Sequence, residues 1–271
     1  MKIGYTIWTW GLESENNFIT ALKEIKELGY SYFENFIGMA DLYYDKIDEF
    51  NRIVKDNGLE FVAIYNYISN LDEDNVAKAE KYLNFCKKTG AKIMNIQAPS
   101  RNGKPSNADL DKLCKTLNDI GKLSKNYDVT LCLHPHFETT VEQEDEIDYM
   151  AAGTDPQYLS FCFDTAHTVV GGMDPVKFYP KYKGRIDYMH IKDQDPAIDI
   201  AAYRKEWHEN FNSLQRFFEL GAKGIDFPAV VQTLKDIGYD GFLVVELDTP
   251  TESNYAGAMV NRKYIAEKLG M

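Results

Sequence analysis

The sequence predicts a single α/β domain, a (β/α)8 TIM barrel over residues 1–271, and three observations favour this fold. The length suits one large barrel, since such barrels typically have about 250 residues. A unit of amphipathic helix, helix-ending glycine and short β-rich run recurs along the chain. Eight β-rich runs alternate with helical patterns without an intervening linker, which favours a closed barrel over an open doubly wound sheet.

Glycines mark the ends of the expected helices. Gly29, Gly58, Gly90 and Gly238 each follow an amphipathic stretch, at the position where a left-handed residue commonly ends a helix. The first three are spaced by about 30 residues, the length of one βα repeat. The spacing therefore indicates consecutive units of one repeating architecture.

The eight expected strands are mostly continuous apolar runs, as is typical of parallel strands covered on both faces. They are residues 3–8, 32–36, 60–65, 92–97, 130–134, 159–164, 187–191 and 242–246. After the seventh strand, residues of about 193–224 form a segment longer than the usual connection in such a fold. We expect this segment to be a long loop over the catalytic mouth, as a lid or substrate wall.

Charge and composition narrow the function. The net charge of −12 and the pI near 4.9 oppose nucleic-acid binding, which depends on Lys and Arg contacts to phosphates. A small-molecule substrate is the better expectation. The four cysteines form no CxxC pair and are expected to be buried, reduced thiols. Without a signal-peptide pattern or an apolar run of about 20 residues, a cytoplasmic location and no membrane partner are expected.

Histidines carry the strongest site signal. Four of the five, His134, His136, His167 and His190, lie at or just beyond the ends of the fifth, sixth and seventh strands. The carboxyl ends of barrel strands meet at one mouth, so these side chains are expected to become neighbours. The fifth, His208, lies in the long segment, where a packing role is the simpler interpretation.

Polar and acidic residues end the strands as well. A carboxylate directly after an apolar run is costly unless it meets a cation or hydrogen-bond donors. Asp164, His190 and Glu246 end three consecutive strands, which predicts a divalent-metal site. Glu34 and Asp193 could bind substrate, or serve as a helix cap or loop hydrogen-bonder. Trp8 could form an apolar wall for a sugar ring, with core packing as the alternative.

Motifs at strands five to eight resemble a known family. The segments HPHFETTVE, FDTAH, YMHIKD and VVELD, in this order, are similar to the xylose isomerase-like barrel superfamily of sugar isomerases and epimerases, within it most of all to the inosose dehydratase branch. The resemblance implies a metal site formed by Glu142, Asp164, His190 and Glu246. His134 stands where many relatives place Glu, so Glu138 and Glu142 are the nearest acids, and the resemblance favours Glu142.

The expected cofactor is one divalent metal ion, with Mn first and Mg, Co or Zn as alternatives, because the site is rich in oxygen donors. The ion would polarise the carbonyl of a keto sugar or keto-cyclitol and stabilise the enolate. An imidazole at His134 could protonate a leaving group, which favours β-elimination. The candidate catalytic residues are His134, His136, His167, Lys192 and Glu246; the candidate substrate-binding residues are Trp8, Glu34, Asn66, Gln97 and Asp193.

Three other functions stay open at this point. A sugar isomerase or epimerase would use the same metal site. An abasic-site endonuclease of similar fold would need three zinc ions and a basic face, which the few histidines and the acidic charge disfavour. A non-catalytic sugar-binding subunit is the fourth hypothesis. No residue in the sequence decides whether the chain forms a homo-oligomer.

Overall fold

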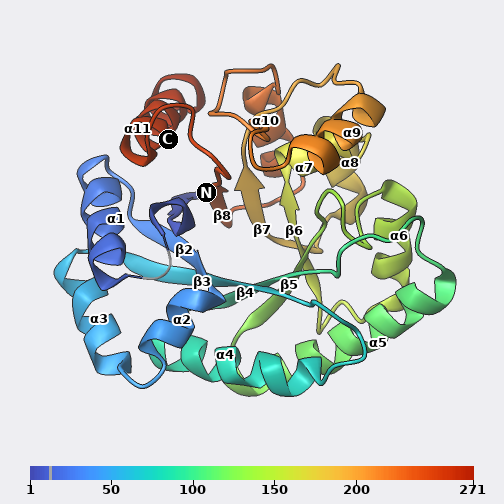
Figure 1. Ribbon diagram of the computed structural model, residues 1–271, viewed down its shortest axis with the longest axis horizontal. Coiled ribbons are helices and arrows are strands. Elements are labelled where there is room, and N and C mark those ends of the chain that lie inside the picture. Colours follow the sequence, from blue (N-terminus) through green and yellow to red (C-terminus); the bar gives the residue numbers. More distant parts are fainter. Residues whose placement is uncertain (12–13) are drawn as a thin grey trace.

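The computed structural model describes residues 1–11 and 14–271. Its strands are all parallel and close into a barrel in chain order, which confirms the predicted fold class (Figure 1). The strands are β1 (Lys2–Thr6), β2 (Tyr32–Phe36), β3 (Glu60–Tyr67), β4 (Ile93–Gln97), β5 (Thr130–His134), β6 (Ser160–Asp164), β7 (Ile186–Ile191) and β8 (Phe242–Val245).

Helices surround the barrel and connect its strands (Figure 1). They are α1 (Glu15–Glu27), α2 (Ile37–Tyr43), α3 (Ile47–Asp56), α4 (Asn75–Thr89), α5 (Asn107–Ser124), α6 (Glu144–Gly153), α7 (Thr165–Val170), α8 (Pro175–Phe178), α9 (Ile200–Asn210), α10 (Phe227–Asp236) and α11 (Asn254–Tyr264). Short 3-10 turns cover Trp8–Trp10, Lys125–Tyr127 and Tyr179–Tyr182, and a π-helical turn covers Ile265–Leu269.

The helix ends follow the expected chemistry. Gly90 ends α4 in the left-handed conformation, at a φ of 88°, and its N–H donates to the carbonyl of Cys86 over 2.8 Å. Gly238 adopts the same conformation after α10, at a φ of 84°. Glycine takes a positive φ without the steric cost that a side chain adds. The repeat seen in the sequence is therefore the βα repeat of the barrel.

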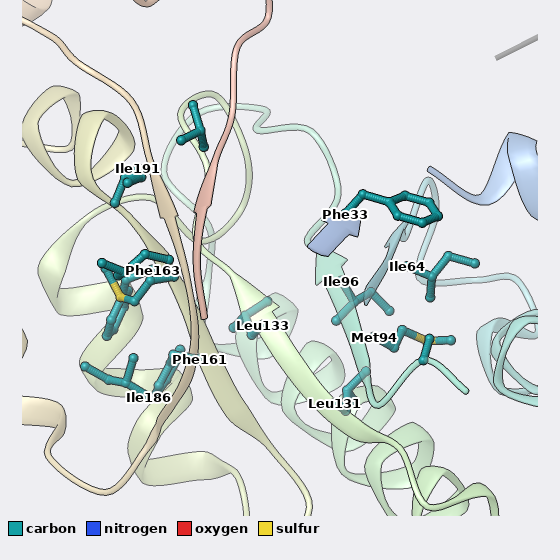
Figure 2. Packing of buried hydrophobic residues seen from close by; sticks show 14 of the residues in the cluster. Phe33, Ile64, Met94, Ile96, Leu131, Leu133, Phe161, Phe163, Ile186 and Ile191 are labelled. Atoms are coloured by element: carbon teal, nitrogen blue, oxygen red, sulfur yellow. The ribbon is translucent and has the colours of Figure 1, made fainter. Parts of the chain in front are cut away.

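Successive side chains of each strand point to opposite faces of the barrel wall, because a strand has a period of two residues. Outward-facing residues such as Met94, Leu133 and Phe163 form the main core between barrel and helices (Figure 2). Cys162 and Tyr188 belong to a separate cluster that fills the barrel interior. Continuing the inward-facing series by two residues along each strand leads to polar side chains at the carboxyl-terminal mouth.

The segment after β7 contains helix α9, where the sequence predicted a loop. Asp199 caps this helix by accepting hydrogen bonds from the backbone N–H groups of the next turn. Tyr203 and Trp207, four residues apart on the helix, pack with Phe137 and Phe217 in a third apolar cluster. Side chains at this spacing share one helix face, so α9 is held against the mouth by an apolar stripe.

Asp193 ties the two ends of this segment together. Its carboxylate accepts hydrogen bonds from the backbone N–H groups of Lys223 at 2.8 Å and Ile225 at 3.0 Å. Asp193 also pairs with Phe218 in an isolated antiparallel bridge.

In the part of the chain that the structure describes, no helix has the length and apolar character needed to cross a membrane.

Candidate metal centre

Asp164, His190 and Glu246 converge at the carboxyl-terminal mouth of the barrel. Asp164 is the last residue of β6 and pairs with His190 on β7, and Glu246 follows directly after β8. One ligand atom from each of the three lies within 4.8 Å of the others, and all three side chains are buried. Residues far apart in the sequence thus form one compact group of potential metal donors.

His190 is held between two carboxylates. Its Nε2 lies 2.6 Å from Oε2 of Glu34, and its Nδ1 lies 2.7 Å from Oε2 of Glu246. The other oxygen of Glu34 accepts a hydrogen bond from Asn95 Nδ2 at 2.7 Å. A metal-binding imidazole usually uses its second nitrogen in this way to fix the ring. Glu34, predicted to bind substrate or to cap a helix, instead lies behind His190 with both oxygens engaged.

Each member of the group has a donor atom without a hydrogen-bond partner among residues 1–11 and 14–271. These atoms are Asp164 Oδ2, His190 Nδ1 and Glu246 Oε2, so the close approach of Nδ1 and Oε2 lacks hydrogen-bond geometry. Buried polar atoms are nearly always satisfied by a partner, and unsatisfied ones call for an explanation such as an ion. Two carboxylates and an imidazole suit Mn, Co or Zn, so the residues present fit the expected divalent cation.

Lys192 places a positive charge beside the same carboxylates. Its Nζ lies 2.6 Å from Oε1 of Glu246, 3.7 Å from Oδ2 of Asp164 and 3.5 Å from Oδ2 of Asp248. Burial lowers the pKa of Lys192, but Asp164, Asp248 and Glu246 outweigh burial and raise it. The ammonium is therefore protonated and can act as a proton donor or hold a developing negative charge.

Asp248 was missed by the sequence analysis, although it ends the quoted VVELD motif. The signal was present, because Asp248 lies two residues beyond Glu246 and therefore continues the inward-facing series. Its carboxylate also lies 3.9 Å from Nε of Arg216. Asp248 thus extends the charged group from the barrel strands towards Arg216 in the segment after β7.

The protonation states of the three candidate ligands depend on one another. Burial raises the pKa of Asp164 to about 7, against the opposing effect of Lys192. Burial also acts to raise the pKa of Glu246, but Lys192 and His190 outweigh it and hold this pKa well below its usual range. Burial lowers the pKa of His190, whereas Cys162, Glu34 and Glu246 together raise it well above its usual value.

His134 presents a free nitrogen to the interior. Its Nδ1 lies 3.1 Å from the carbonyl oxygen of Cys162 and donates to it, while Nε2 is buried without a partner in the described structure. Burial, followed by the charge of His190, holds the pKa of His134 well below its usual value. The ring is therefore neutral, with its proton on Nδ1 and a lone pair on Nε2.

His136 and His167 form a complementary pair with ring centroids 3.8 Å apart. Nδ1 of His136 donates to the carbonyl of Phe137 at 2.6 Å, whereas Nδ1 of His167 accepts from the N–H of Phe137 at 3.2 Å. Burial and Lys192 lower the pKa of His136 to about 4, and burial followed by His136 holds the pKa of His167 well below its usual value. In the neutral rings, Nε2 of His136 is an acceptor and Nε2 of His167 is a donor.

The structure does not bring Glu142 to the metal group, so the predicted fourth ligand needs correction. Its carboxylate forms ion pairs with Arg101, at 3.1 Å, and with Arg204, and it accepts the backbone N–H of Glu138 at 2.9 Å. Glu138, the alternative, pairs with Arg204 and lies 2.9 Å from His208 Nε2. The guanidinium groups occupy both acids. Neither arginine had a signal in the sequence, because each lies in a connection rather than at a strand end.

The remaining predicted substrate-binding residues divide into two groups. The ring of Trp8 lies 4.4 Å from that of Phe36 and 6.3 Å from that of His190, and Gln97 Oε1 accepts the Tyr65 hydroxyl at 2.7 Å. Trp8 therefore borders the group of potential metal donors, and Gln97 is linked to it through Tyr65, whose ring lies 6.2 Å from that of His190. Two others accept hydrogen bonds from backbone N–H groups: Asn66 Oδ1 from Tyr67 at 2.8 Å, and Asp193 from Lys223, 30 residues along the chain, at 2.8 Å.

Comparisons with known proteins show which family model and which relatives the chain matches. The family model described as xylose isomerase-like TIM barrel matches residues 22–267. The inosose dehydratase of Bacillus velezensis is 33% identical over 169 residues, which cover 60% of this chain and only 56% of that relative. The inosose dehydratase of Clostridium botulinum is 26% identical over 278 residues, covering 95% of this chain and 91% of the relative.

A solved structure of the IolI protein, which contains a bound zinc atom, has a TM-score of 0.79 at 18% identity. The similarity covers 98% of this chain and 97% of IolI. At this level of identity the likeness shows that the two chains share a fold.

Proposed function

The chain belongs to the xylose isomerase-like TIM barrel family, as its motifs predicted, and on that premise we propose that it is a divalent-metal-dependent carbohydrate lyase. Its substrate is a keto sugar or keto-cyclitol, and its reaction is enolisation followed by β-elimination, as for an inosose dehydratase or a 3-keto-glycoside lyase. The observation that carries this proposal is the group of unpartnered, buried donor atoms of Asp164, His190 and Glu246.

Asp164, His190 and Glu246 hold the cation in this proposal, with Mn as the first expectation and Mg, Co or Zn as alternatives. When bound, a divalent cation polarises the substrate carbonyl and stabilises the enolate oxygen. Glu34 contributes by holding the imidazole of His190 in place. Support for a metal also comes from the relationship in fold to IolI, which was solved with zinc.

Proton transfer falls to the side chains around the centre. His136, with its acceptor Nε2, can take the proton from the carbon next to the carbonyl. The protonated Lys192 can donate a proton to the departing hydroxyl or glycosidic oxygen, which leaves as water or alcohol, and the neutral His167 can donate a hydrogen bond from Nε2 to that oxygen. Positioned acids and bases of this kind typically contribute about 10²–10⁴-fold to rate.

Helix α9 and its flanking loops act as a lid in this proposal. The ring of Phe217 lies 4.7 Å from that of His167, and the ring of Trp207 lies 6.3 Å from that of His136. These contacts bury His167 and partly cover His136, imidazoles that must reach the substrate, so the segment has to move aside for entry. Closure over the substrate would then exclude water from the enolate.

Incubation with a keto-inositol, a 3-keto glycoside and a panel of ketoses, with Mn²⁺ or Co²⁺ present, tests the proposal. New enone absorbance with loss of water or aglycone supports β-elimination. Incorporation of solvent deuterium without elimination would instead establish a sugar isomerase or epimerase that uses the same centre. Absence of both reactions in protein shown to contain metal would contradict an enolising enzyme.

A further inference from the structure

We infer that His134 is the strand-five ligand of this centre, which therefore binds its cation through two imidazoles and two carboxylates. The inference rests on the proposed function for the presence of a metal. It assigns to His134 a place in the coordination shell, where the resemblance had placed an acid.

The first argument is the position of His134 in the barrel. Cys132 and Cys162 fill the interior of the barrel wall on neighbouring strands. Two residues further along the same inward-facing series come His134 on β5 and Asp164 on β6. Tyr188 leads in the same way to His190, and Val244 leads to Glu246. Four consecutive strands thus each present one inward-facing donor towards the mouth, and among these donors Asp164 and His190 are direct register partners.

The second argument is the orientation of the ring. His134 donates Nδ1–H to the carbonyl of Cys162 and leaves Nε2 buried and unpartnered in the described part of the chain. Metal-binding histidines almost always donate their other ring N–H to a carbonyl or carboxylate, which fixes both tautomer and direction. His134 meets this condition through Cys162, and His190 meets it through Glu34.

The third argument is proximity. Ligand atoms of His134, Cys162 and His190 lie within 4.8 Å of one another, and the rings of His134 and His190 have centroids 5.0 Å apart. This separation is compatible with two nitrogens about 2.1 Å from one ion. The sulfur of Cys162 lies in the same group, so the test must also distinguish a thiolate ligand. His190 is also a member of the group with Asp164 and Glu246, so it joins His134 to the two carboxylates.

The assignment changes the expected chemistry of the centre. Three carboxylates and one imidazole would be a hard, oxygen-rich set, whereas two imidazoles and two carboxylates form a softer one. Imidazole suits Zn, Fe, Ni and Cu, while carboxylate and water suit Mg, Ca and Mn. The centre should therefore prefer Co²⁺ or Zn²⁺ to Mg²⁺ more strongly than a site with three acids would.

The variant His134→Asn tests the assignment. Asparagine Nδ2 can replace the Nδ1–H donor towards Cys162, but asparagine has no equivalent of Nε2. We expect the affinity for Co²⁺, measured by calorimetry, to fall at least about 100-fold. Loss of a residue that only hydrogen-bonds a metal ligand typically costs no more than about 100-fold. His136→Asn is the matched control, since His136 also donates Nδ1–H to a backbone carbonyl, and its affinity should stay within threefold of the wild type (about 0.65 kcal/mol).

A second measurement does not depend on the folding of a variant. Pulsed electron paramagnetic resonance of wild-type protein loaded with Mn²⁺ should show couplings to two imidazole nitrogens, and His134→Asn, where it is folded, should retain one. A single nitrogen in the wild type, or Co²⁺ affinity within threefold of wild type in folded His134→Asn, would overturn the assignment and leave the proposed function intact. A thiolate-to-cobalt charge-transfer band would overturn it in favour of Cys162. Wild-type protein that binds neither Co²⁺ nor Mn²⁺ would instead contradict the proposed function itself.

Discussion

Two pairs of acids lie at the same end of the barrel and differ in what surrounds their oxygens. Glu138 and Glu142 meet the guanidinium groups of Arg204 and, for Glu142, also of Arg101. Asp164 and Glu246 meet a lysine and a histidine and each retain an oxygen without a hydrogen-bond partner in the structure as described.

Glu138 and Glu142 therefore belong to an ion-pair network, whereas Asp164 and Glu246 keep unpartnered oxygens that a metal ion can bind. A guanidinium offers five donors in a planar fork and can satisfy several carboxylate oxygens at once. A single ammonium at Lys192 cannot satisfy all the oxygens of Asp164, Glu246 and Asp248 around it. Proximity to the mouth is therefore a weaker guide to a metal ligand than an unsatisfied donor atom.

The largest expected effect comes from removing one of the proposed ligands. Asp164→Asn or Glu246→Gln should abolish stable binding of Mn²⁺ or Co²⁺ and lower kcat/KM at least about 10³-fold, since a Lewis acid supplies several kcal/mol of charge stabilisation. Glu142→Gln, measured on folded protein by calorimetry and steady-state kinetics, should keep its metal. Equal loss of metal in Glu142→Gln would erase the distinction between the two pairs.

Removing the positively charged side chain beside each pair of acids, Lys192 or Arg101, should distinguish the two pairs by whether added metal restores stability. Lys192→Met leaves buried carboxylates uncompensated and should lower the free energy of unfolding of the metal-free protein by about 3–5 kcal/mol. Added Co²⁺ should restore much of this loss, because it binds the same carboxylates. Arg101→Met, in denaturant titrations under the same conditions, should be destabilised with no comparable recovery.

Metal affinity should depend on pH at the ligand pair. The deprotonated forms of Asp164 and His190 bind a cation, and their pKa values are both raised, that of Asp164 to about 7. Affinity for Co²⁺ should therefore weaken as the pH falls below 7, by up to about tenfold per pH unit for each proton displaced. Calorimetry in buffers of different ionisation enthalpy would count those protons. Affinity that is flat between pH 5 and 7 would contradict these protonation states.

The smallest effect is expected at the arginine that joins the acid pair to helix α9. Arg204→Ala removes partly exposed ion pairs worth about 1 kcal/mol, so amide hydrogen exchange within α9 should accelerate by about fivefold. Lys205→Ala is the control, because Lys205 is exposed and lies 4.0 Å from Glu209 on the same helix. Metal affinity should not change in either variant. Unchanged exchange in Arg204→Ala would show that the apolar stripe alone holds the lid.

The sequence predicted the fold and the centre of the site because both depend on periodic features. Alternating helices and apolar strands specify the barrel, and the carboxyl ends of parallel strands meet at one mouth. Asp164, His190 and Glu246 follow from that rule alone. The rule also covers His134, but the resemblance to relatives with an acid at strand five directed attention to Glu142.

The residues that the sequence did not predict lie in connections or depend on partners remote in the chain. Arg101 lies in the connection after β4, and Arg204 lies on helix α9, where the sequence predicted a loop, so no strand-end position indicated either side chain. Glu34 lies in the middle of β2 rather than at its end, and only the structure shows that His190 and Asn95 occupy its oxygens. Sequence patterns predict how far along a barrel strand a side chain lies better than they predict which residue that side chain contacts.

The carboxylate of Asp193 should make the proposed lid more tolerant of changes in length and sequence than the barrel strands are. Asp193 lies at the start of the segment between β7 and α10 and binds backbone N–H groups near its end. The length and sequence of the residues between these points can therefore vary while β7 and α10 keep their places. Such a segment could be exchanged between related enzymes to alter which substrate is admitted, with the strands that carry the proposed metal ligands left untouched.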